Sequence, residues 1–553
     1  MANTMSETAY EITNSYLEIL DPEDLPTPED ISNNLVTLIN DSIELRNAVV
    51  GKANKWPCIR ELPPQIIAFI LVRLYPVKRI AAAGCDTEQS YDLLGIYAES
   101  GENAGLYETD ELALKRRIRS FNKLIKEHEI KEAISVLNEQ APRVERCRKK
   151  DLVAVNNGIF DFRKKQLLPF SPDYVFLVKS RVNYNPLAMN VTIHNPIDGT
   201  DWDVESWIKE LFDDNQRPVL IWEILSAVVR PNVLWKKSAW FYSEVGNNGK
   251  GTLCSLMRNL IGEKSCASIP LSEMGKDFAL EPLIYSSAII VDENDVGTYI
   301  DKAANLKAIV THDAIQINRK FKTPIAFKFY GFMVQCLNEF PRVKDKSDSF
   351  YRRYLFVPFD KSFTGRERKY IKDDYLKREE VLEYVLFRVL NMTHYELSEP
   401  DACKAALAEY KEYNDPVRQF VEELLPQCVW DLLPFPFLYD LYIAWFRKNV
   451  PSGSPQSKKT FTNDLLNAIS GSKEWVCRGK NVKIRTSIRM NRPEPLLLEY
   501  ELKDWYNETY RGNDPDKICI PKTKAAYRGL LRNNIAATIT QKDIDDGNGD
   551  DDE

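Results

Sequence analysis

The chain has 553 residues, of which 44% are hydrophobic and 28% charged, with a formal net charge of −7. This length is enough for roughly three or four domains, and the composition is that of a globular protein with large cores. No stretch approaches the ~20 apolar residues of a membrane-spanning helix. The acidic start of the chain lacks the order of a secretion signal. We therefore expect a cytoplasmic protein with no membrane segment.

The charge is unevenly distributed along the chain. The last eleven residues, 543–553, hold seven acids and no base, so the remainder is formally neutral and local basic patches matter more than the total. We expect 531–553 to be a disordered acidic tail. The ten cysteines contain no Cys-x-x-Cys pair and do not cluster with the four histidines, which predicts reduced thiols and no structural metal.

Residues 1–150 are predicted to be mainly helical, because Leu35, Leu38, Ile39 and Ile43 keep a helical spacing. Two basic clusters lie in this region, at 115–126 and at 143–150. Each is typical either of a solvated helix face or of a nucleic-acid or collar surface, and the residues alone leave both interpretations open.

From residue 151 the pattern changes to short β-like runs. A turn at Asn157-Gly158 between Leu152–Val155 and Ile159–Phe162 predicts a hairpin within a small segment, 151–205. Residues 206–365 alternate helix and strand patterns, as an α/β core does. We expect a helical connector over 366–414 and a smaller α+β unit over 415–530, giving a multidomain α/β protein.

The strongest motif follows the apolar run Ser238–Tyr242. The residues after it are Gly246-Asn247-Asn248-Gly249-Lys250-Gly251-Thr252, and a helix pattern with Leu253, Leu256, Met257 and Leu260 on one face begins there. This order predicts a P-loop: backbone N–H groups surround phosphate oxygens, and the lysine and helix dipole neutralise their charge. Glu244 and Gly251 depart from the usual pattern, which leaves Mg²⁺ binding by Thr252 open. Gly-Lys-Gly-Thr is also typical of adenylate kinases.

Two carboxylates, Asp292 and Glu293, follow the buried run Ala288–Val291. Since ligands of α/β sheets lie at the carboxyl ends of the strands, we expect ATP and Mg²⁺ there. Asp292 is predicted to hold Mg²⁺, and Glu293 to orient and deprotonate the attacking water.

A third run, Phe332–Leu337, ends on Asn338, whose amide is predicted to reach both the γ-phosphate and the water. Arg352 and Arg353 precede another β-like segment. We interpret them as arginine fingers that act on the ATP of a neighbouring subunit, and which of the two does so stays open.

These motifs together resemble a superfamily III helicase of the phage, plasmid and poxvirus primase-helicase type. The features are Asn248–Thr252, Asp292-Glu293, Asn338–Arg342 and Asp348–Arg353, with Val155–Asp161 similar to the segment before that core. The resemblance implies an AAA+-like P-loop core, a hexameric ring, 3′-to-5′ movement on single-stranded or forked DNA, and a role in replication of a phage or mobile element.

The resemblance also implies a β-hairpin that projects into the ring pore, and Ile315–Phe329 fits it. Its turn contains Arg319, Lys320, Phe321 and Lys322, so Arg319, Lys320 and Lys322 are the predicted DNA contacts. Helix patterns at 417–425, 438–446 and 461–469, followed by Val482–Arg485, are consistent with a winged helix or with a small domain that packs on the ring.

No convincing primase carboxylate pair occurs within 1–150, so any primase or origin-binding protein would be a separate partner. Two other functions stay open. A P-loop nucleotide kinase is supported only by Gly-Lys-Gly-Thr. A nucleotide-gated assembly factor or loader would bind DNA without unwinding it.

Overall fold

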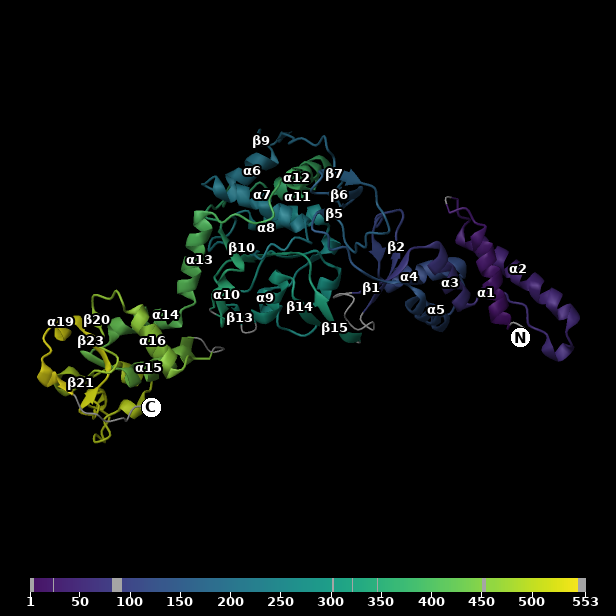
Figure 1. The fold of residues 1–553 in the computed structure, drawn as a ribbon. Helices are drawn as coiled ribbons and strands as arrows, with labels where there is room; N and C mark the ends of the chain where they lie inside the picture. Colours follow the sequence, from purple (N-terminus) through teal and green to yellow (C-terminus); the bar gives the residue numbers. More distant parts are fainter. Residues whose placement is uncertain are drawn as a thin grey trace. The chain divides into compact units, whose positions relative to one another are not determined.

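The computed structural model describes residues 4–22, 24–81, 92–300, 303–320, 322–345, 347–449 and 454–545. The chain forms two compact units (Figure 1). The first comprises Met1–Thr298, Lys302–Glu339 and Arg352–Lys404, and the second comprises Tyr299–Asp301, Phe340–Tyr351 and Ala405–Glu553. Within the described ranges, no helix has the length and apolar character needed to cross a membrane.

The first unit begins with a helical region, as predicted. Its helices are α1 (Met5–Glu18), α2 (Pro28–Val49), α3 (Pro64–Leu74), α4 (Glu111–Phe121) and α5 (Glu127–Gln140). Thr4 and Thr27 cap α1 and α2, each accepting a backbone hydrogen bond from the first turn. On α2 the buried stripe is Ile31, Leu35, Ile39 and Ile43, while Leu38 is 42% exposed.

A four-stranded sheet in this region was not predicted. Its order is β3 (Tyr107–Glu108), β2 (Leu93–Tyr97), β1 (Val77–Ala81) and β4 (Arg143–Glu145), with β1 and β4 parallel and the other pairs antiparallel. The buried carboxylate of Asp92 pairs with Arg79 and Arg143. The strands are short and far apart in sequence, so no local periodicity indicates their pairing.

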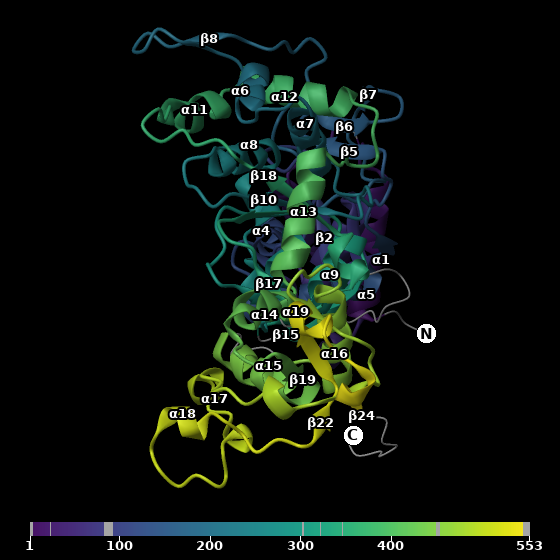
Figure 2. The same ribbon diagram turned by 90° about the vertical axis from the view of Figure 1, so that its left-hand side faces the viewer.

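The predicted hairpin is present, with its turn one residue earlier than expected. Strand β5 (Leu152–Val155) pairs with β6 (Gly158–Asp161), so Asn156 and Asn157 form the turn and Gly158 begins the second strand. Glycine is needed at 158 because a Cβ there would lie 2.5 Å from the carbonyl oxygen of Leu168, in β7 (Gln166–Leu168). Farther on, β8 (Ile193–His194) pairs with β9 (Asp201–Trp202) on a segment that extends away from α6 (Val204–Glu210) (Figure 2).

The centre of the first unit is a five-stranded parallel sheet. Its order is β11 (Cys266–Ala267), β12 (Ala288–Val291), β16 (Phe332–Leu337), β10 (Ser238–Tyr242) and β18 (Tyr354–Pro358). Apart from Cys266 and Pro358 at its edges, every residue of these strands is buried. Such continuous apolar strands are typical of a parallel sheet that is covered on both faces.

Helices α7 (Gln216–Val229), α8 (Lys250–Ile261) and α12 (Glu379–Asn391) pack against one another beside this sheet (Figure 1). The structure therefore differs from the predicted connector over 366–414, because Val385, Leu386 and Val389 of α12 are completely buried in the same core as the sheet strands. The other helices of this part are α9 (Ala303–Thr311) and α11 (Lys369–Asp373).

The second unit has its own core. Helices α14 (Pro416–Leu424), α15 (Phe435–Asn449) and α16 (Lys458–Ala468) match the three predicted helices, and α13 (Asp401–Tyr413) precedes them. Where the three helices meet, Tyr442 stacks on Phe461, and Phe420 contacts both rings edge-on. The winged-helix assignment itself stays a prediction.

Two small sheets complete the second unit. One has the order β19 (Leu432–Pro434), β23 (Gly529–Arg532) and β20 (Trp475–Val476), and the other β22 (Ala526–Tyr527), β21 (Lys483–Arg485) and β24 (Ile544–Asp545). Shorter elements are β13 (Tyr299–Ile300), β17 (Arg342–Val343), α10 (Asp348–Tyr351), α17 (Leu496–Glu499), α18 (Pro515–Ile518) and α19 (Asn533–Ala536).

The predicted start of the acidic tail at 531 was wrong. Leu531 is buried in β23, Ile544 pairs with Ile484 across β24 and β21, and the Asp543 carboxylate accepts a hydrogen bond from Arg489 at 2.8 Å. Apolar residues and an ion pair hold these positions, and the acidic composition alone did not reveal them. Residues 546–553 lie outside the described part of the chain.

Candidate nucleotide site

The loop between β10 and α8 has the geometry of a strand–loop–helix turn whose helix begins at Lys250. Gly249 caps this helix with φ +88°, a left-handed conformation that glycine adopts without strain. A Cβ at Gly249 would also lie 2.6 Å from a methyl carbon of Leu211, so the position excludes side chains for a second reason. Four of the predicted helix positions, Leu253, Leu256, Met257 and Leu260, are completely buried.

The ammonium group of Lys250 lies at the carboxyl edge of the sheet, surrounded by oxygen acceptors. Its Nζ donates to Asn338 Oδ1 at 3.0 Å, to the carbonyl of Leu337 at 3.1 Å and to the carbonyl of Ser243 at 3.3 Å. Burial lowers the pKa of Lys250, and the neighbouring negative charge of Glu293 acts in the opposite direction. The structure thus brings the predicted loop lysine together with Asn338.

Strand register explains why residues far apart in sequence meet here. Tyr242 at the end of β10 lies beside Leu337 of β16, and Val291 at the end of β12 lies beside Gln335. Since the three strands are parallel, the residues that follow each of them emerge at one edge. Strand β16 lies between β10 and β12, so Asn338 emerges between the loop and the acidic pair.

The two carboxylates differ in their surroundings. Asp292 pairs with the guanidinium of Arg258, at 2.7 Å from Nη1 to Oδ1, and Arg258 also donates to the carbonyl of Ile290 at 2.9 Å. Glu293 is exposed. Asn294, the next residue, is buried and donates to the Gln335 side chain and to the Cys336 carbonyl, which ties the end of β12 to β16.

Sequence reasoning missed Arg258, Asn294 and Glu339. Arg258 was detectable, because Lys250, Cys254 and Arg258 repeat every four residues and therefore share one face of α8. Glu339 accepts a hydrogen bond from the backbone N–H of Gly297 at 3.0 Å. This bond joins the loop after the acidic pair to the loop after Asn338, a pairing that only the tertiary structure reveals.

Arg352 and Arg353 lie at the other edge of the sheet. The backbone carbonyl of Arg353 accepts a hydrogen bond from Ser238, the first residue of β10, and Tyr354 is the register partner of Ser238. The loop Gly246–Thr252 follows the opposite end of β10, five residues away, which is roughly 15 Å along a strand. Arg352 is exposed. Neither arginine belongs to the cluster around Lys250.

The predicted hairpin is formed by β14 (Ala314–Arg319) and β15 (Lys322–Lys328), with an irregularity between Ile317 and Arg319. Ile315, Ile317, Ile325 and Phe327 are buried, which anchors the hairpin. Arg319 is half-buried and Lys320 is exposed near the tip. Phe321 and the side chain of Lys322 lie outside the described part of the structure.

The two N-terminal basic clusters have structural partners. Lys115 and Arg119 both pair with Glu127, and Arg143 pairs with Asp92. Arg146 donates to the carbonyl of Lys328 and lies 5.0 Å from the ring of Phe327. Lys115, Arg119 and Arg143 are thus ion-paired, and Arg146 contacts a carbonyl oxygen and an aromatic ring. A nucleic-acid or collar role for either cluster stays a prediction.

Three segments of the chain match protein-family models. Residues 61–213 match the D5 N terminal like family, residues 241–353 a family of unknown function (DUF5906), and residues 412–507 the Poxvirus D5 protein-like family. Two of these segments, 61–213 and 412–507, are similar to D5-like proteins. These matches support the predicted resemblance to poxvirus proteins. Membership of superfamily III stays a prediction.

Among solved structures, the A form apo structure of the NrS-1 C-terminal region is similar at 14% sequence identity and a TM-score of 0.41, over 80% of this chain and 91% of that chain. Another apo structure of the same region gives 12% identity and a TM-score of 0.39, over 76% of this chain and 98% of that one. No curated protein matches the chain.

Proposed function

We propose that this protein is an ATP-dependent DNA helicase of a phage or mobile element, and that it works as a ring on single-stranded DNA. The observation that carries the proposal is the position of Lys250, whose ammonium group is 3.0 Å from Asn338 Oδ1 at the sheet edge where Asp292 and Glu293 also emerge. A lysine, an amide and two carboxylates at the end of a parallel sheet are the groups that triphosphate hydrolysis requires.

In this proposal, the phosphates lie on the backbone N–H groups of the loop at the N-terminus of α8, where the helix dipole favours anions. Lys250 exchanges its carbonyl contacts for phosphate oxygens. Asn338 touches the γ-phosphate and the attacking water. Glu293 accepts a proton from that water. The oxygen of the water bonds to the γ-phosphorus while the bond between the γ-phosphorus and the β–γ bridging oxygen breaks, and ADP leaves with the bridging oxygen.

The donor set fits Mg²⁺, which usually binds through one or two carboxylates, water and substrate phosphates rather than through an all-protein cage. Within the described residues no group of three or more His, Cys, Asp and Glu side chains could hold a metal by itself. Asp292, with Thr252 as a second oxygen ligand, would hold an ion that arrives with ATP, and the ion would neutralise phosphate charge. Arg258 would compete with Mg²⁺ for the Asp292 carboxylate. When the ion binds, the ion pair must therefore break, or the carboxylate must bind the ion and Arg258 together.

The position of Arg352 and Arg353 favours action between subunits. Because they precede β18 while the loop follows β10, they are distant from the phosphate loop of their own chain. Arginines that stabilise the transition state from this position must belong to another copy, which is the reason to expect a ring. The β14–β15 hairpin, with Arg319, Lys320 and Lys322, is the proposed DNA contact.

Two other functions make different demands on the same residues. A nucleotide kinase needs neither an asparagine beside the lysine nor an arginine pair at the far edge of the sheet, so the geometry favours a kinase less. A loader or assembly factor would use the same ATP site, and only the effect of DNA on turnover separates it from a helicase.

The test is ATP turnover by the full chain with and without single-stranded DNA. We expect turnover to rise severalfold with DNA, and Lys250→Ala to remove both the basal and the stimulated rate. Turnover that DNA does not change would favour the loader. Phosphate appearing on a nucleoside monophosphate would favour the kinase.

A further inference from the structure

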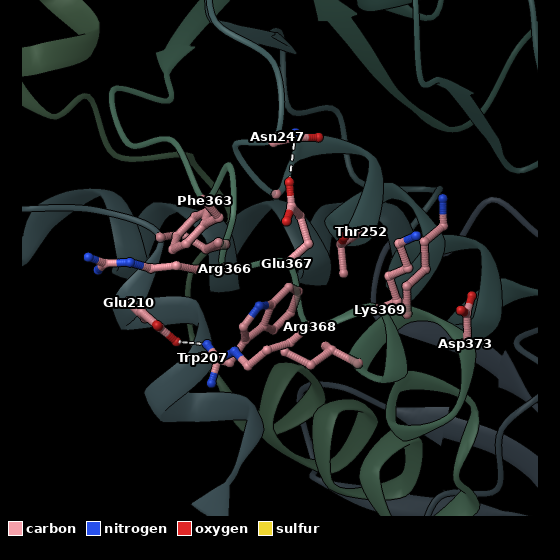
Figure 3. Close-up of a pocket in the computed structure, with 14 residues that line it drawn as sticks. Trp207, Glu210, Asn247, Thr252, Phe363, Arg366, Glu367, Arg368, Lys369 and Asp373 are labelled. Atoms are coloured by element: carbon pink, nitrogen blue, oxygen red, sulfur yellow. Dashed lines mark hydrogen bonds and ion pairs between the residues drawn. The ribbon is translucent and has the colours of Figure 1, made fainter. Parts of the chain in front are cut away.

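A pocket of about 330 Å³ opens beside the phosphate loop (Figure 3). Asn247, Gly249 and Thr252 line one side of it, Trp207 and Leu211 line another, and residues from the segment 363–373 close the third. Its volume is at the lower end of the range for small-ligand sites. Lys250, Asn338, Asp292 and Glu293 do not line this pocket, so the proposed hydrolysis site does not account for it.

The third wall of the pocket is bonded to the phosphate loop. The backbone N–H of Phe363 donates to the carbonyl of Asn247 at 2.7 Å, and the hydroxyl of Ser362 donates to the carbonyl of Gly246 at 3.4 Å. The amide of Asn247 donates to Glu367 Oε1 at 3.1 Å. Asn247 itself has φ +54°, an uncommon conformation for a residue other than glycine. The wall therefore holds the loop in a defined conformation.

The lining is partly apolar and partly polar. Phe363 is half-buried against the core of the unit, and with Trp207, Leu211 and Ile371 it gives the pocket an apolar body. Glu367 points toward Asn247 and lies between the phosphate loop and this body (Figure 3). The rim carries the cations Arg366, Arg368, Lys369 and Lys372, of which Arg368 pairs with Glu210.

This order of surfaces corresponds to the parts of a nucleotide. Phosphates fit the loop, a carboxylate next to it can accept hydroxyl hydrogen bonds as acidic residues do from ribose, and an aromatic ring beyond can stack on a base for about 1–3 kcal/mol. A purely anionic ligand would leave the apolar body without a role, and a purely apolar ligand would leave Glu367 desolvated.

We propose that this pocket takes the nucleoside part of the triphosphate, with Phe363 against the base and Glu367 accepting a ribose hydroxyl. The inference rests on the proposed function only in requiring a triphosphate on the loop between Gly246 and Thr252. It is independent of DNA and of ring formation.

The first test needs no variant. Titration calorimetry with the full chain and Mg²⁺ compares ATP with inorganic tripolyphosphate, which has the same phosphates and no nucleoside. We expect ATP to bind at least about tenfold more tightly, a difference of about 1.4 kcal/mol. Equal affinities would overturn the pocket and leave the phosphate site standing, whereas a chain that binds neither ligand would overturn the pocket and the proposed function together.

The second test removes the aromatic wall. Phe363→Ala keeps the backbone bond to Asn247, so we expect ATP affinity to fall about tenfold while tripolyphosphate affinity stays within about twofold. Phe278→Ala is the matched control, because Phe278 is 52% exposed in the same unit and does not line the pocket. An unchanged ATP affinity in Phe363→Ala would contradict the assignment.

The third test addresses the carboxylate. Glu367→Gln retains an oxygen that can accept from Asn247, so the loop should keep its conformation. We expect wild type to prefer ATP over 2′,3′-dideoxy-ATP and the variant to lose most of that preference. The same preference in both proteins would remove Glu367 from nucleoside recognition.

Discussion

At the scale of single residues, the site is organised around one buried ammonium group. Lys250 has three oxygen acceptors within 3.3 Å, from two strand ends and from Asn338. Burial disfavours its charged form, so an anion at this point gains more from the lysine than it would on the surface. The residue is therefore suited to bind one phosphate group in one position.

Lys250→Ala should reduce ATP turnover at least about 100-fold, since removal of a single preorganised donor to a developing charge has effects of that order. Lys264→Ala is the control, because its side chain is 82% exposed and its nearest carboxylate is 3.9 Å away. Steady-state phosphate release measures both. Ordinary turnover in Lys250→Ala would rule out the phosphate-loop assignment.

Asn338→Ala should separate binding from chemistry. Lys250 and the backbone N–H groups of the loop would still bind the phosphates, so ATP binding should change less than about threefold. Because the amide is proposed to position the attacking water, kcat should fall about 100-fold. A raised KM with an unchanged kcat would mean that Asn338 only helps to hold the nucleotide.

At the scale of elements, the strands and hairpins that depend on local sequence patterns could be predicted. Strands β10 and β12 match the predicted runs residue for residue, and the hairpin at 152–161 lies where turn residues separate apolar runs. Apolar runs and turn residues are local signals, so these elements could be recognised without tertiary information. The hairpin at 314–328 is the one that the family resemblance implies over Ile315–Phe329, shifted by one residue.

Elements defined by distant contacts could not be predicted in this way. The N-terminal sheet joins strands from 77 to 145, and the sequence pattern predicts only a helical connector at α12, although its apolar face completes the main core. For the same reason the sequence predicted the loop Gly246–Thr252 without the segment around Phe363 that is hydrogen-bonded to it. The helical spacing of Lys250, Cys254 and Arg258 places Arg258 on the loop's face of α8, but its ion pair with Asp292 is seen only in the tertiary structure.

The β14–β15 hairpin yields a prediction at this scale. Lys320→Ala combined with Lys322→Ala should leave basal ATP turnover intact and remove most of its stimulation by DNA. The log–log salt dependence of single-strand binding should become shallower by about 0.7 for each DNA phosphate that the variant no longer neutralises. The double variant Lys264→Ala, Lys276→Ala, with two exposed lysines elsewhere in the same unit, is the control. Full stimulation in the hairpin variant would exclude it from the DNA path.

At the scale of the whole molecule, the two ends of the parallel sheet are assigned different tasks. The carboxyl edge carries the loop Gly246–Thr252, the acidic pair and Asn338, while Arg352 and Arg353 lie at the amino edge. If the proposed function holds, each edge of the sheet supplies half of a transition-state site, and copies arranged head to tail in a closed ring would complete every site.

Mixing experiments test this complementation. Subunits with Arg352→Ala and Arg353→Ala should be inactive alone, as should Lys250→Ala subunits. In mixtures, an intact loop next to an intact pair of arginines should restore part of the turnover, with a maximum near equal proportions. If no ratio restores turnover, the arginines do not act between subunits. The two single arginine variants, mixed in the same way, identify the residue responsible.

The most direct measurement of the central claim is strand separation by the full chain with ATP and Mg²⁺. The substrates are duplexes that carry a single-stranded tail at either the 3′ or the 5′ end. We predict ATP-dependent unwinding of the 3′-tailed duplex, none of the 5′-tailed duplex, and none of either by Lys250→Ala. Turnover of ATP without separation of either duplex would contradict the helicase assignment.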